Sequence, residues 1–143
     1  MDTKINGENM KKLLFLFSLL LSSPAFADVD IVVNKRTQTM KVYVDGDQVH
    51  SWPVSTARKG YITPSGTYHP YSLQPMHYSR KYDNAPMPHS IFFSGGYAIH
   101  ATPNTRNLGH AASHGCVRLH PTSAAILYSL VQNNRNNTTI TIN

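Results

Sequence analysis

Short runs of alternating apolar and polar residues dominate the chain from about residue 28 onward. Alternation with a period of two is typical of β-strands that bury one face. It predicts strands over residues 28–34, 40–44, 49–56 and 138–142. Asp45-Gly46 supplies a hairpin turn between the second and third of these strands. Pro53 indicates that the third is an edge strand or contains a bulge.

The middle of the chain is less regular. Residues 58–68 predict a loop and turn that lead into a strand, and residues 91–93 and 97–100 predict buried strands on either side of a Gly-Gly pair. Residues 69–90 are rich in Pro, Tyr, His, Ser and Asn and predict a long irregular segment. Loops of that length in a compact domain are usually functional, so we expect a lid or a substrate wall, with a surface insertion as the alternative. Residues 101–112 predict another loop.

One helix is predicted, over residues 121–132. Pro121 suits the first position of a helix, where its missing N–H has no intrahelical partner. The helical spacing also yields one apolar stripe. Its members are Ile126, Leu127, Leu130 and Val131. The pattern as a whole therefore predicts a mostly β domain with one helix.

The N-terminus resembles an export signal. Two lysines precede an apolar run over residues 13–21, and a small-x-small sequence ends at Ala27. This pattern predicts a cleaved signal peptide over residues 1–27, with a few extra residues before Met10, which is the more natural start. The apolar run is short for a bilayer span, so we expect no stable membrane span after cleavage, and an uncleaved anchor is the alternative. Residues 28–143 would then form one domain.

The net positive charge of residues 28–143 limits the kinds of partner that we expect. Residues 28–143 hold ten Lys and Arg against five Asp, and residues 84–143 contain no Asp or Glu. A basic domain suits anionic partners such as nucleic acid, lipid headgroups or an acidic wall polymer. Export argues against nucleic acid. Because residues 84–143 contain no Asp or Glu, a pair of catalytic carboxylates cannot come from this half of the chain. A metal site within it would need His and Cys ligands.

The single cysteine of the chain is Cys116. Exported thiols usually form disulfides, and one cysteine cannot form one within its own chain. Cys116 is therefore buried and inert, paired with another molecule, or a nucleophile. His114 and His100 favour the nucleophile, because an imidazole can take the thiol proton or lower the thiol pKa, and we expect an accessible Cys116 thiol with a lowered pKa. The N–H groups of Gly115 and Cys116 could stabilise an oxyanion.

Three sequence blocks carry a resemblance to a known family. Ser-His-Gly-Cys-Val-Arg stands at residues 113–118, after a strand that ends in Ile-His at 99–100. Val-Ser-Thr at 54–56 and Thr-Pro-Ser-Gly-Thr-Tyr at 63–68 precede it in the same order. Together these blocks resemble the L,D-transpeptidase (YkuD-type) family of bacterial cell-wall enzymes. The resemblance covers residues 29–142.

The resemblance implies a β-sandwich of mixed sheets with one short helix after the catalytic cysteine. It also implies a reaction on peptidoglycan stem peptides, in which the enzyme attacks the third residue of a tetrapeptide stem, releases the terminal D-Ala and passes the acyl group to an amine. We expect no cofactor and no metal. We expect a monomer in the periplasm or another extracytoplasmic, cell-wall-associated location.

Residue by residue, the resemblance implies that Cys116 is the nucleophile and His100 the general base, with the other ring nitrogen of His100 held by a backbone carbonyl. The residues that it implies for the pocket or for assistance are Ser113, His114, Gly115, Arg118 and Ala101. Ala101 stands where the family often has glycine, and its methyl group could narrow the approach to the carbonyl that orients His100.

Several alternatives remain at this point. The same acyl-enzyme could be resolved by water, which would make an L,D-carboxypeptidase or another wall hydrolase. The chain could also be a wall-binding module without catalysis. A third alternative is a zinc site formed by His110, His114 and Cys116, although the glycine-containing loop argues against it.

Overall fold

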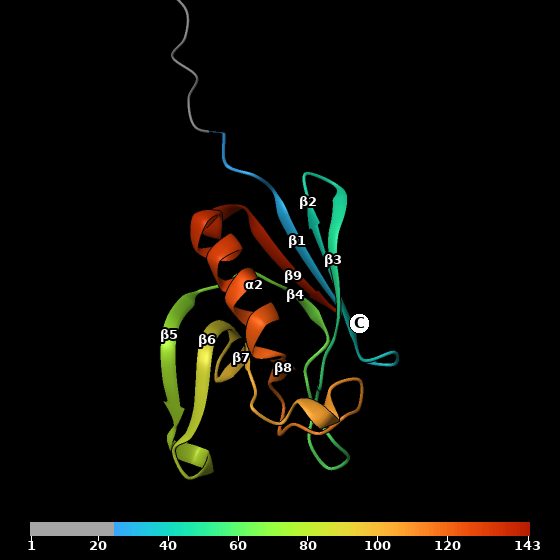
Figure 1. The fold of residues 1–143 in the computed structure, drawn as a ribbon, viewed down its shortest axis with the longest axis vertical. Coiled ribbons are helices and arrows are strands. Elements are labelled where there is room, and N and C mark those ends of the chain that lie inside the picture. The colour runs from blue at the N-terminus through green and yellow to red at the C-terminus, as the bar shows by residue number, and fades with distance from the viewer. Residues whose placement is uncertain (1–24) are drawn as a thin grey trace, which may run out of the picture.

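The computed structural model describes residues 25–143, which form two β-sheets and one α-helix (Figure 1). Buried and exposed side chains alternate along several of the strands. The predicted signal peptide lies almost wholly outside the described residues. The strands are β1 (Val29–Asn34), β2 (Thr39–Val44), β3 (Asp47–Pro53), β4 (Gly66–Tyr68), β5 (Ser72–Ser79), β6 (Ala85–Ser94), β7 (Tyr97–Ala101), β8 (Val117–Leu119) and β9 (Thr138–Ile142). The helices are α2 (Pro121–Asn133) and the 3-10 turns η1 (Arg80–Tyr82), η2 (Thr105–Asn107) and η3 (Arg135–Asn137).

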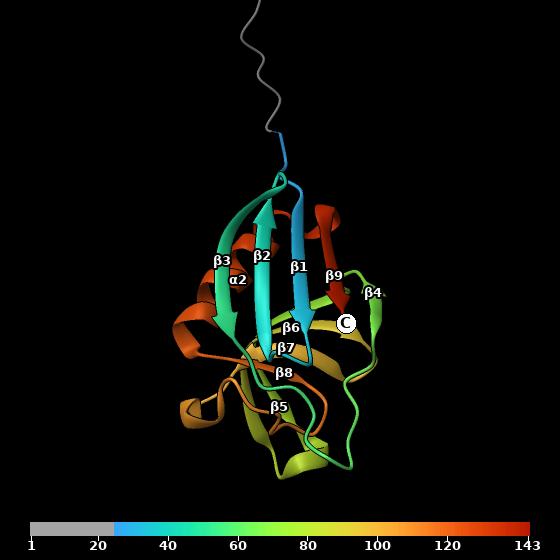
Figure 2. The ribbon, with the colours of Figure 1, turned by 90° about the vertical axis from the view of Figure 1, so that its right-hand side faces the viewer.

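Both sheets are mixed. The first has the strand order β3-β2-β1-β9-β4, and the second has the order β5-β6-β7-β8. Each contains one parallel pair, β1 with β9 and β7 with β8, while the other pairs are antiparallel. Figure 2 shows the first sheet from its outer face, with the second sheet behind it. The predicted mostly β architecture is confirmed.

The main hydrophobic core lies between the sheets and α2. The strands contribute every second side chain, such as Val29, Ile31 and Val33 of β1, and these are fully buried. Their alternation with polar residues is the reason that the sequence pattern locates β1, β2 and β9 to within a few residues. The second sheet contributes residues of β6, β7 and β8 to the same core.

The helix α2 begins at the predicted Pro121 and ends one residue beyond the predicted end. The imidazole Nδ1 of His120 caps it by accepting the N–H of Thr122 at 3.1 Å. Its buried residues are Ala124, Leu127, Tyr128 and Val131. The predicted apolar stripe is wrong at Ile126, which is 43% exposed. The small Ala124 and the aromatic Tyr128 face the core instead, so the buried face is rotated from the predicted one.

The segment 69–90 differs most from its prediction. It forms an antiparallel hairpin of β5 and β6 with η1 at its tip, where an irregular loop was expected. Its prolines misled the pattern, because proline is rare inside sheets. Pro86 and Pro88 lie in the part of β6 that pairs only with β5, since β7 pairs with β6 from Ile91 onward. The open side of β6 tolerates their missing N–H groups.

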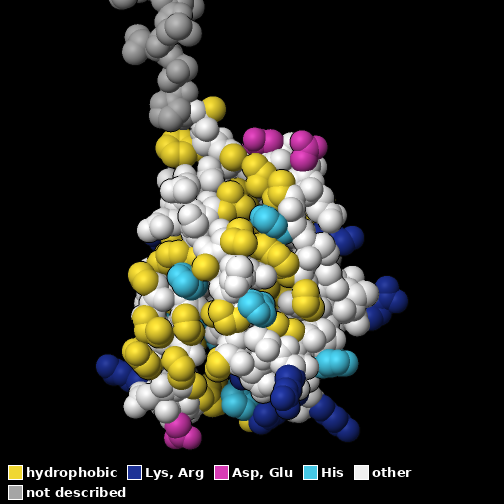
Figure 3. Space-filling view, in the orientation of Figure 1, with side chains coloured by type: hydrophobic (Ala, Val, Ile, Leu, Met, Phe, Trp, Pro, Cys, Tyr) yellow, Lys and Arg dark blue, Asp and Glu magenta, His cyan; other side chains and the backbone are white. Residues whose placement is uncertain are grey.

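Charged side chains separate along the long axis of the molecule (Figure 3). Four aspartates belong to the start of β1 and to the β2–β3 turn, namely Asp28, Asp30, Asp45 and Asp47. Several lysine and arginine side chains lie at the opposite end, where η1 and the loop after β3 lie, and others lie along the flank of this face. None of the helices formed by residues 25–143 is both long enough and apolar enough to cross a membrane.

The buried face of α2 can be tested by two neighbouring truncations. Leu127→Ala removes a fully buried side chain, and we expect it to lower the free energy of unfolding by about 2–5 kcal/mol. Ile126→Ala removes an exposed side chain of the same size, and the expected loss is below about 1 kcal/mol. Chemical denaturation measures both. Similar losses for the two variants would contradict the observed helix rotation.

Candidate active site

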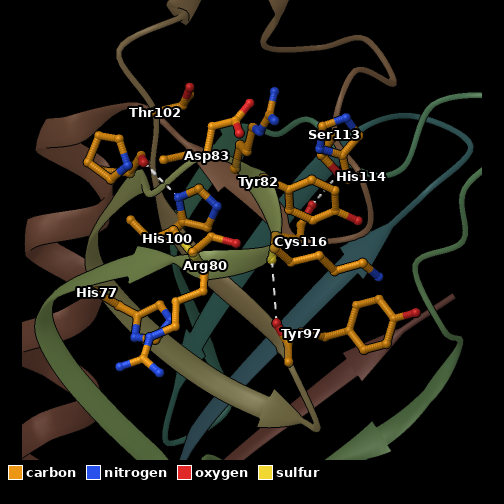
Figure 4. A pocket seen from close by; sticks show the side chains of 18 of the residues that line it. His77, Arg80, Tyr82, Asp83, Tyr97, His100, Thr102, Ser113, His114 and Cys116 are labelled. Atoms are coloured by element: carbon orange, nitrogen blue, oxygen red, sulfur yellow. Dashed lines mark hydrogen bonds between the residues drawn. The ribbon is translucent and has the colours of Figure 1, made fainter.

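The parallel pairing of β7 with β8 brings His100 and Cys116 together. Ile99 pairs with Val117, and His100 pairs with Arg118, so Cys116 stands level with Ala98. Side chains two residues apart on a strand share a face. His100 and Cys116 are therefore diagonal neighbours on the sheet face that points away from the main core, and they line one pocket (Figure 4).

The imidazole of His100 is fixed by its own strand. Its Nδ1 lies 2.7 Å from the backbone oxygen of Ala101. A carbonyl only accepts, so Nδ1 carries the proton and Nε2 keeps its lone pair. The ring is 7% exposed. Burial lowers the pKa of His100 to about 4, partly opposed by the Ala101 hydrogen bond. The imidazole is therefore neutral near pH 7 and suited to accept a proton at Nε2.

The thiol of Cys116 lies on an apolar floor formed by Met87, Phe92 and Ala98. Its Sγ lies 3.8 Å from the backbone oxygen of Gly96. Burial raises the pKa of the Cys116 thiol, while the backbone N–H of Ala98 and the Arg118 guanidinium act in the opposite sense. The sequence-based expectation of a thiol with a lowered pKa is wrong for this environment. The resting site is a neutral thiol beside a neutral imidazole.

The turn before Cys116 is held by Ser113. The Ser113 hydroxyl donates to the backbone oxygen of Cys116 at 2.6 Å and accepts the N–H of Gly115 at 3.0 Å. The Gly115 N–H is thus engaged and cannot serve as the oxyanion donor that the sequence suggested. The Cys116 N–H is the remaining candidate of that pair. Gly115 has a φ of +140°, a conformation that side chains rarely adopt.

Two upstream sequence blocks support this turn. The backbone of Ser55 pairs with that of Arg118 through hydrogen bonds of 2.9 and 3.1 Å. The Thr63 hydroxyl accepts the N–H of Ala57 at 2.9 Å and donates to the backbone oxygen of Gly115 at 2.7 Å. The Val-Ser-Thr and Thr-Pro motifs therefore act as structural supports of the loop that carries the cysteine.

A buried amide completes the support. The side chain of Gln38 donates to the Thr56 hydroxyl at 2.6 Å and accepts the Thr56 N–H at 2.8 Å. The carbonyl of Thr56 in turn accepts the N–H groups of Ala112 and Ser113. Gln38 was not among the predicted site residues, because nothing in its local sequence marks an amide 18 residues from its partner.

Ala101 does not obstruct the base. It is 2% exposed and belongs to the main hydrophobic core, while its backbone carbonyl accepts the hydrogen bond from the Nδ1–H of His100. Because successive strand residues point to opposite faces, the methyl group of Ala101 points away from the face that carries His100. The expected narrowing at this carbonyl is therefore absent from the site.

A pocket of about 790 Å³ surrounds the thiol. Residues of the β5–β6 hairpin and its tip form one wall, and the loop after β7 forms another. Its charged lining residues are Arg80, Lys81, Asp83 and Arg118. Burial lowers the pKa of Arg118, and its guanidinium also lies 3.4 Å from the backbone oxygen of Ala112. Arg118 thus contributes both to the pocket and to the support of the loop.

His114 is clamped between two aromatic rings. Tyr82 of η1 stacks on it with ring centroids 4.2 Å apart and an interplanar angle of 22°, and Tyr61 contacts it at 4.7 Å. Arg58 lies over Tyr61 and Lys81 over Tyr82, so the row ends in a cation on each side. Burial lowers the pKa of His114. The positive charges of Arg58, Arg118 and Lys81 lower it further. This row, Arg58–Tyr61–His114–Tyr82–Lys81, is here called the aromatic clamp.

The zinc alternative finds no support in the part of the chain that the structure describes. Across residues 25–143, no three His, Cys, Asp or Glu side chains come close enough together to hold a metal ion. His110 is exposed in the loop before Ser113, while His114 is engaged in the aromatic clamp.

Comparison with known proteins decides the family. The model of the L,D-transpeptidase catalytic domain (YkuD) matches residues 28–142. The chain belongs to this family. YqjB of Bacillus subtilis, a candidate L,D-transpeptidase, is 25% identical over 122 residues, which cover 76% of this chain and 69% of YqjB. YkuD of Bacillus licheniformis, also a candidate L,D-transpeptidase, is 27% identical over 107 residues, which cover 72% of this chain and 60% of that protein.

Solved L,D-transpeptidase structures have the same fold. An L,D-transpeptidase from Mycobacterium smegmatis superposes with a TM-score of 0.73 at 26% identity, covering 82% of this chain and 59% of that one. One from Stackebrandtia nassauensis gives 0.71 at 25% identity, covering 89% and 60%. The chain thus spans about three fifths of these proteins. The predicted family and fold class are confirmed.

This L,D-transpeptidase domain brings the predicted Cys116, His100, Ser113, Gly115 and Arg118 to one pocket or its supporting turn. The sequence predicted a lid or a substrate wall over residues 69–90, and residues of this segment do line the pocket, but it did not predict their contacts with the loop of Cys116. Tyr82 contacts His114 across 32 positions of the chain, and no local pattern marks that contact. The Tyr-rich composition of residues 69–90 was the only available signal.

The buried His100 should make stability depend on pH. Its pKa of about 4 lies below the value of about 6.5 in an unfolded chain, so unfolding takes up a proton between these values. The free energy of unfolding should fall by about 3 kcal/mol more in the parent than in His100→Asn as the pH falls from 7 to 4. Urea denaturation at several pH values measures this. Equal pH dependence in the two proteins would contradict a buried neutral His100.

The close approach at Gly115 predicts a second effect. A Cβ there would lie 2.6 Å from Tyr97 Cε1 and 3.0 Å from the backbone oxygen of Ile62, in an unfavourable φ region. We expect Gly115→Ala to destabilise the fold by about 1–3 kcal/mol and to slow alkylation of Cys116 at least tenfold. Gly109→Ala, which has a φ of +92° but open space around it, is the control for backbone strain alone. Equal alkylation rates in both variants would exclude a packing role for Gly115.

Proposed function

We propose that this L,D-transpeptidase-family domain cross-links peptidoglycan stem peptides through a thioester on Cys116. The observation that carries the proposal is the placement of His100 and Cys116 on one sheet face, with Nδ1 of His100 held by the Ala101 carbonyl. That arrangement leaves Nε2 of a neutral imidazole available for the thiol proton. A wall-binding module would have no need of it.

The first step forms the thioester. The Sγ of Cys116 attacks the carbonyl carbon of the third residue of a tetrapeptide stem, while Nε2 of His100 takes the thiol proton. The tetrahedral intermediate collapses, the bond to the terminal D-Ala nitrogen breaks, and His100 returns the proton to that nitrogen. Because burial raises the pKa of the thiol, proton transfer accompanies attack and no resting thiolate is needed.

The second step transfers the acyl group. An acceptor amine attacks the thioester carbon, the C–S bond breaks and a C–N bond forms. The amine proton passes through His100 to the sulfur, which restores both groups. Water in place of the amine would give hydrolysis and an L,D-carboxypeptidase. The hairpin tip and its Tyr82–His114 contact line the pocket, and a wall that admits an amine stem and limits water would favour transfer.

The charge of the pocket fits an anionic donor. Arg80, Lys81 and Arg118 line it, and the terminal carboxylate of a tetrapeptide stem is the group they would attract. The proposal includes an extracytoplasmic site of action, in the periplasm or at the cell wall, which rests on the predicted signal peptide over residues 1–27. A monomer with no cofactor is sufficient for the chemistry described.

Product analysis tests the function directly. The protein, incubated with a disaccharide-tetrapeptide that carries a side-chain amine on its third residue, should release D-Ala and yield mainly dimers linked between third residues. Mass spectrometry identifies the products. Tripeptide without dimer at high acceptor concentration would change the assignment to L,D-carboxypeptidase. No product with a reactive Cys116 would point to another bond.

Variants of the same reaction separate the roles of the two histidines. Cys116→Ala should form no product, and His100→Ala should lose activity by about two orders of magnitude or more, because the base has no substitute. His114→Ala should lose less, since His114 supports the pocket through the aromatic clamp. A deeper loss in His114→Ala than in His100→Ala would reverse the assigned roles.

A further inference from the structure

One carboxylate stands apart from all others in the described part of the chain. Four of its five aspartates lie at the end with the β2–β3 turn, while Asp83 lies at the opposite end, at the tip of the β5–β6 hairpin (Figure 3). Asp83 lines the catalytic pocket. Its surroundings are basic, since Arg80 and Lys81 stand three and two residues before it in the chain and share the pocket with it, as does Arg118.

A basic pocket creates a difficulty for the second half of the proposed reaction. The acceptor is an aliphatic amine, which is a cation near pH 7 before it reacts. Arg80, Lys81 and Arg118 repel such a cation as strongly as they attract the carboxylate of the donor. Among the described residues that line the pocket, Asp83 carries the one carboxylate that can offset this repulsion.

The backbone holds Asp83 at the pocket wall. Asp83 and Asn84 both have a φ of +53°, in the left-handed region that aspartate and asparagine tolerate better than most residues. The residue before them, Tyr82, is stacked on His114 in the aromatic clamp. The clamp therefore ties Asp83 to the loop of Cys116, and Figure 4 shows Asp83 between Thr102 and Tyr82.

We propose that Asp83 binds the ammonium group of the acceptor and so favours amines that enter the pocket as cations over uncharged nucleophiles. This inference rests on the proposed thioester mechanism. The Asp83 carboxylate raises the local concentration of the ammonium ion beside the acyl-enzyme. The bound ammonium loses one proton to water, and the free amine then attacks the thioester carbon as described above.

The test lets two acceptors compete for one acyl-enzyme. The protein is incubated with the amine-bearing disaccharide-tetrapeptide and with methoxyamine, a nitrogen nucleophile that is uncharged near pH 7. Mass spectrometry measures the ratio of cross-linked dimer to tripeptide methoxyamide. Both products derive from the same thioester, so a change in the rate of its formation does not alter the ratio.

Asp83→Asn should lower this ratio about tenfold, because it removes the charge of the carboxylate that binds the ammonium group. Asparagine tolerates the left-handed backbone at least as well as aspartate, so a purely structural role for Asp83 predicts no change. Raising the salt concentration should lower the ratio in the parent and change it less in Asp83→Asn. Asp47→Asn, an equal charge change at the far end of the molecule, should leave the ratio as in the parent.

Three results would overturn the proposal. The first is a ratio in Asp83→Asn within twofold of the parent, and the second is an equal fall in Asp47→Asn. The third is a parent that forms methoxyamide but no dimer, since the thioester then exists and the stem amine is not its acceptor. A parent that forms neither product has no acyl-enzyme, and in that case the proposed function fails together with the role of Asp83.

Discussion

The short parallel pairing of β7 with β8 is the constraint on which the site depends. It sets the strand register, and the register places the thiol and the imidazole on one face while Ile99, Val117 and Leu119 point into the core. A shift by one residue would exchange these faces, burying polar groups and exposing apolar ones, so the packing of the core and the geometry of the catalytic pair are specified by the same contacts. The supports from Ser55 and Thr63 then fix the turn that begins β8.

Burial determines the protonation states at this site. An apolar floor disfavours the thiolate, and the interior disfavours the imidazolium, so both groups rest in their neutral forms. The charged side chains lie on the pocket walls, and among them Arg118 acts on the thiol pKa in the sense opposite to burial, with the smaller effect. Because burial has the larger effect, Cys116 and His100 stay neutral although basic side chains line the pocket around them.

The sequence predicted the parts of the molecule that depend on local spacing. Alternation located β1, β2 and β9, and the Ser-His-Gly-Cys motif located Cys116, the proposed nucleophile, and its turn. The β5–β6 hairpin was missed because its prolines count against a strand unless the open side of β6 is known. The raised pKa of the thiol and the contact of Tyr82 with His114 depend on which distant segments cover Cys116, and Gln38 reaches Thr56 only after the first sheet has formed. Local composition contains none of this information.

The hydroxyl of Thr63 has a consequence for how this domain can vary. It bonds the N–H of Ala57 and the carbonyl of Gly115, so it closes the base of a short excursion of the chain and joins it to the catalytic turn. Residues 58–62 between these fixed points are all exposed, and Tyr61 contacts His114, which lines the pocket. Both ends of the excursion are anchored, and within it Arg58 and Tyr61 are engaged in the aromatic clamp, so its other exposed positions have the most room to vary. Proteins with this fold could thus differ in the residues beside the pocket while Cys116 keeps its position.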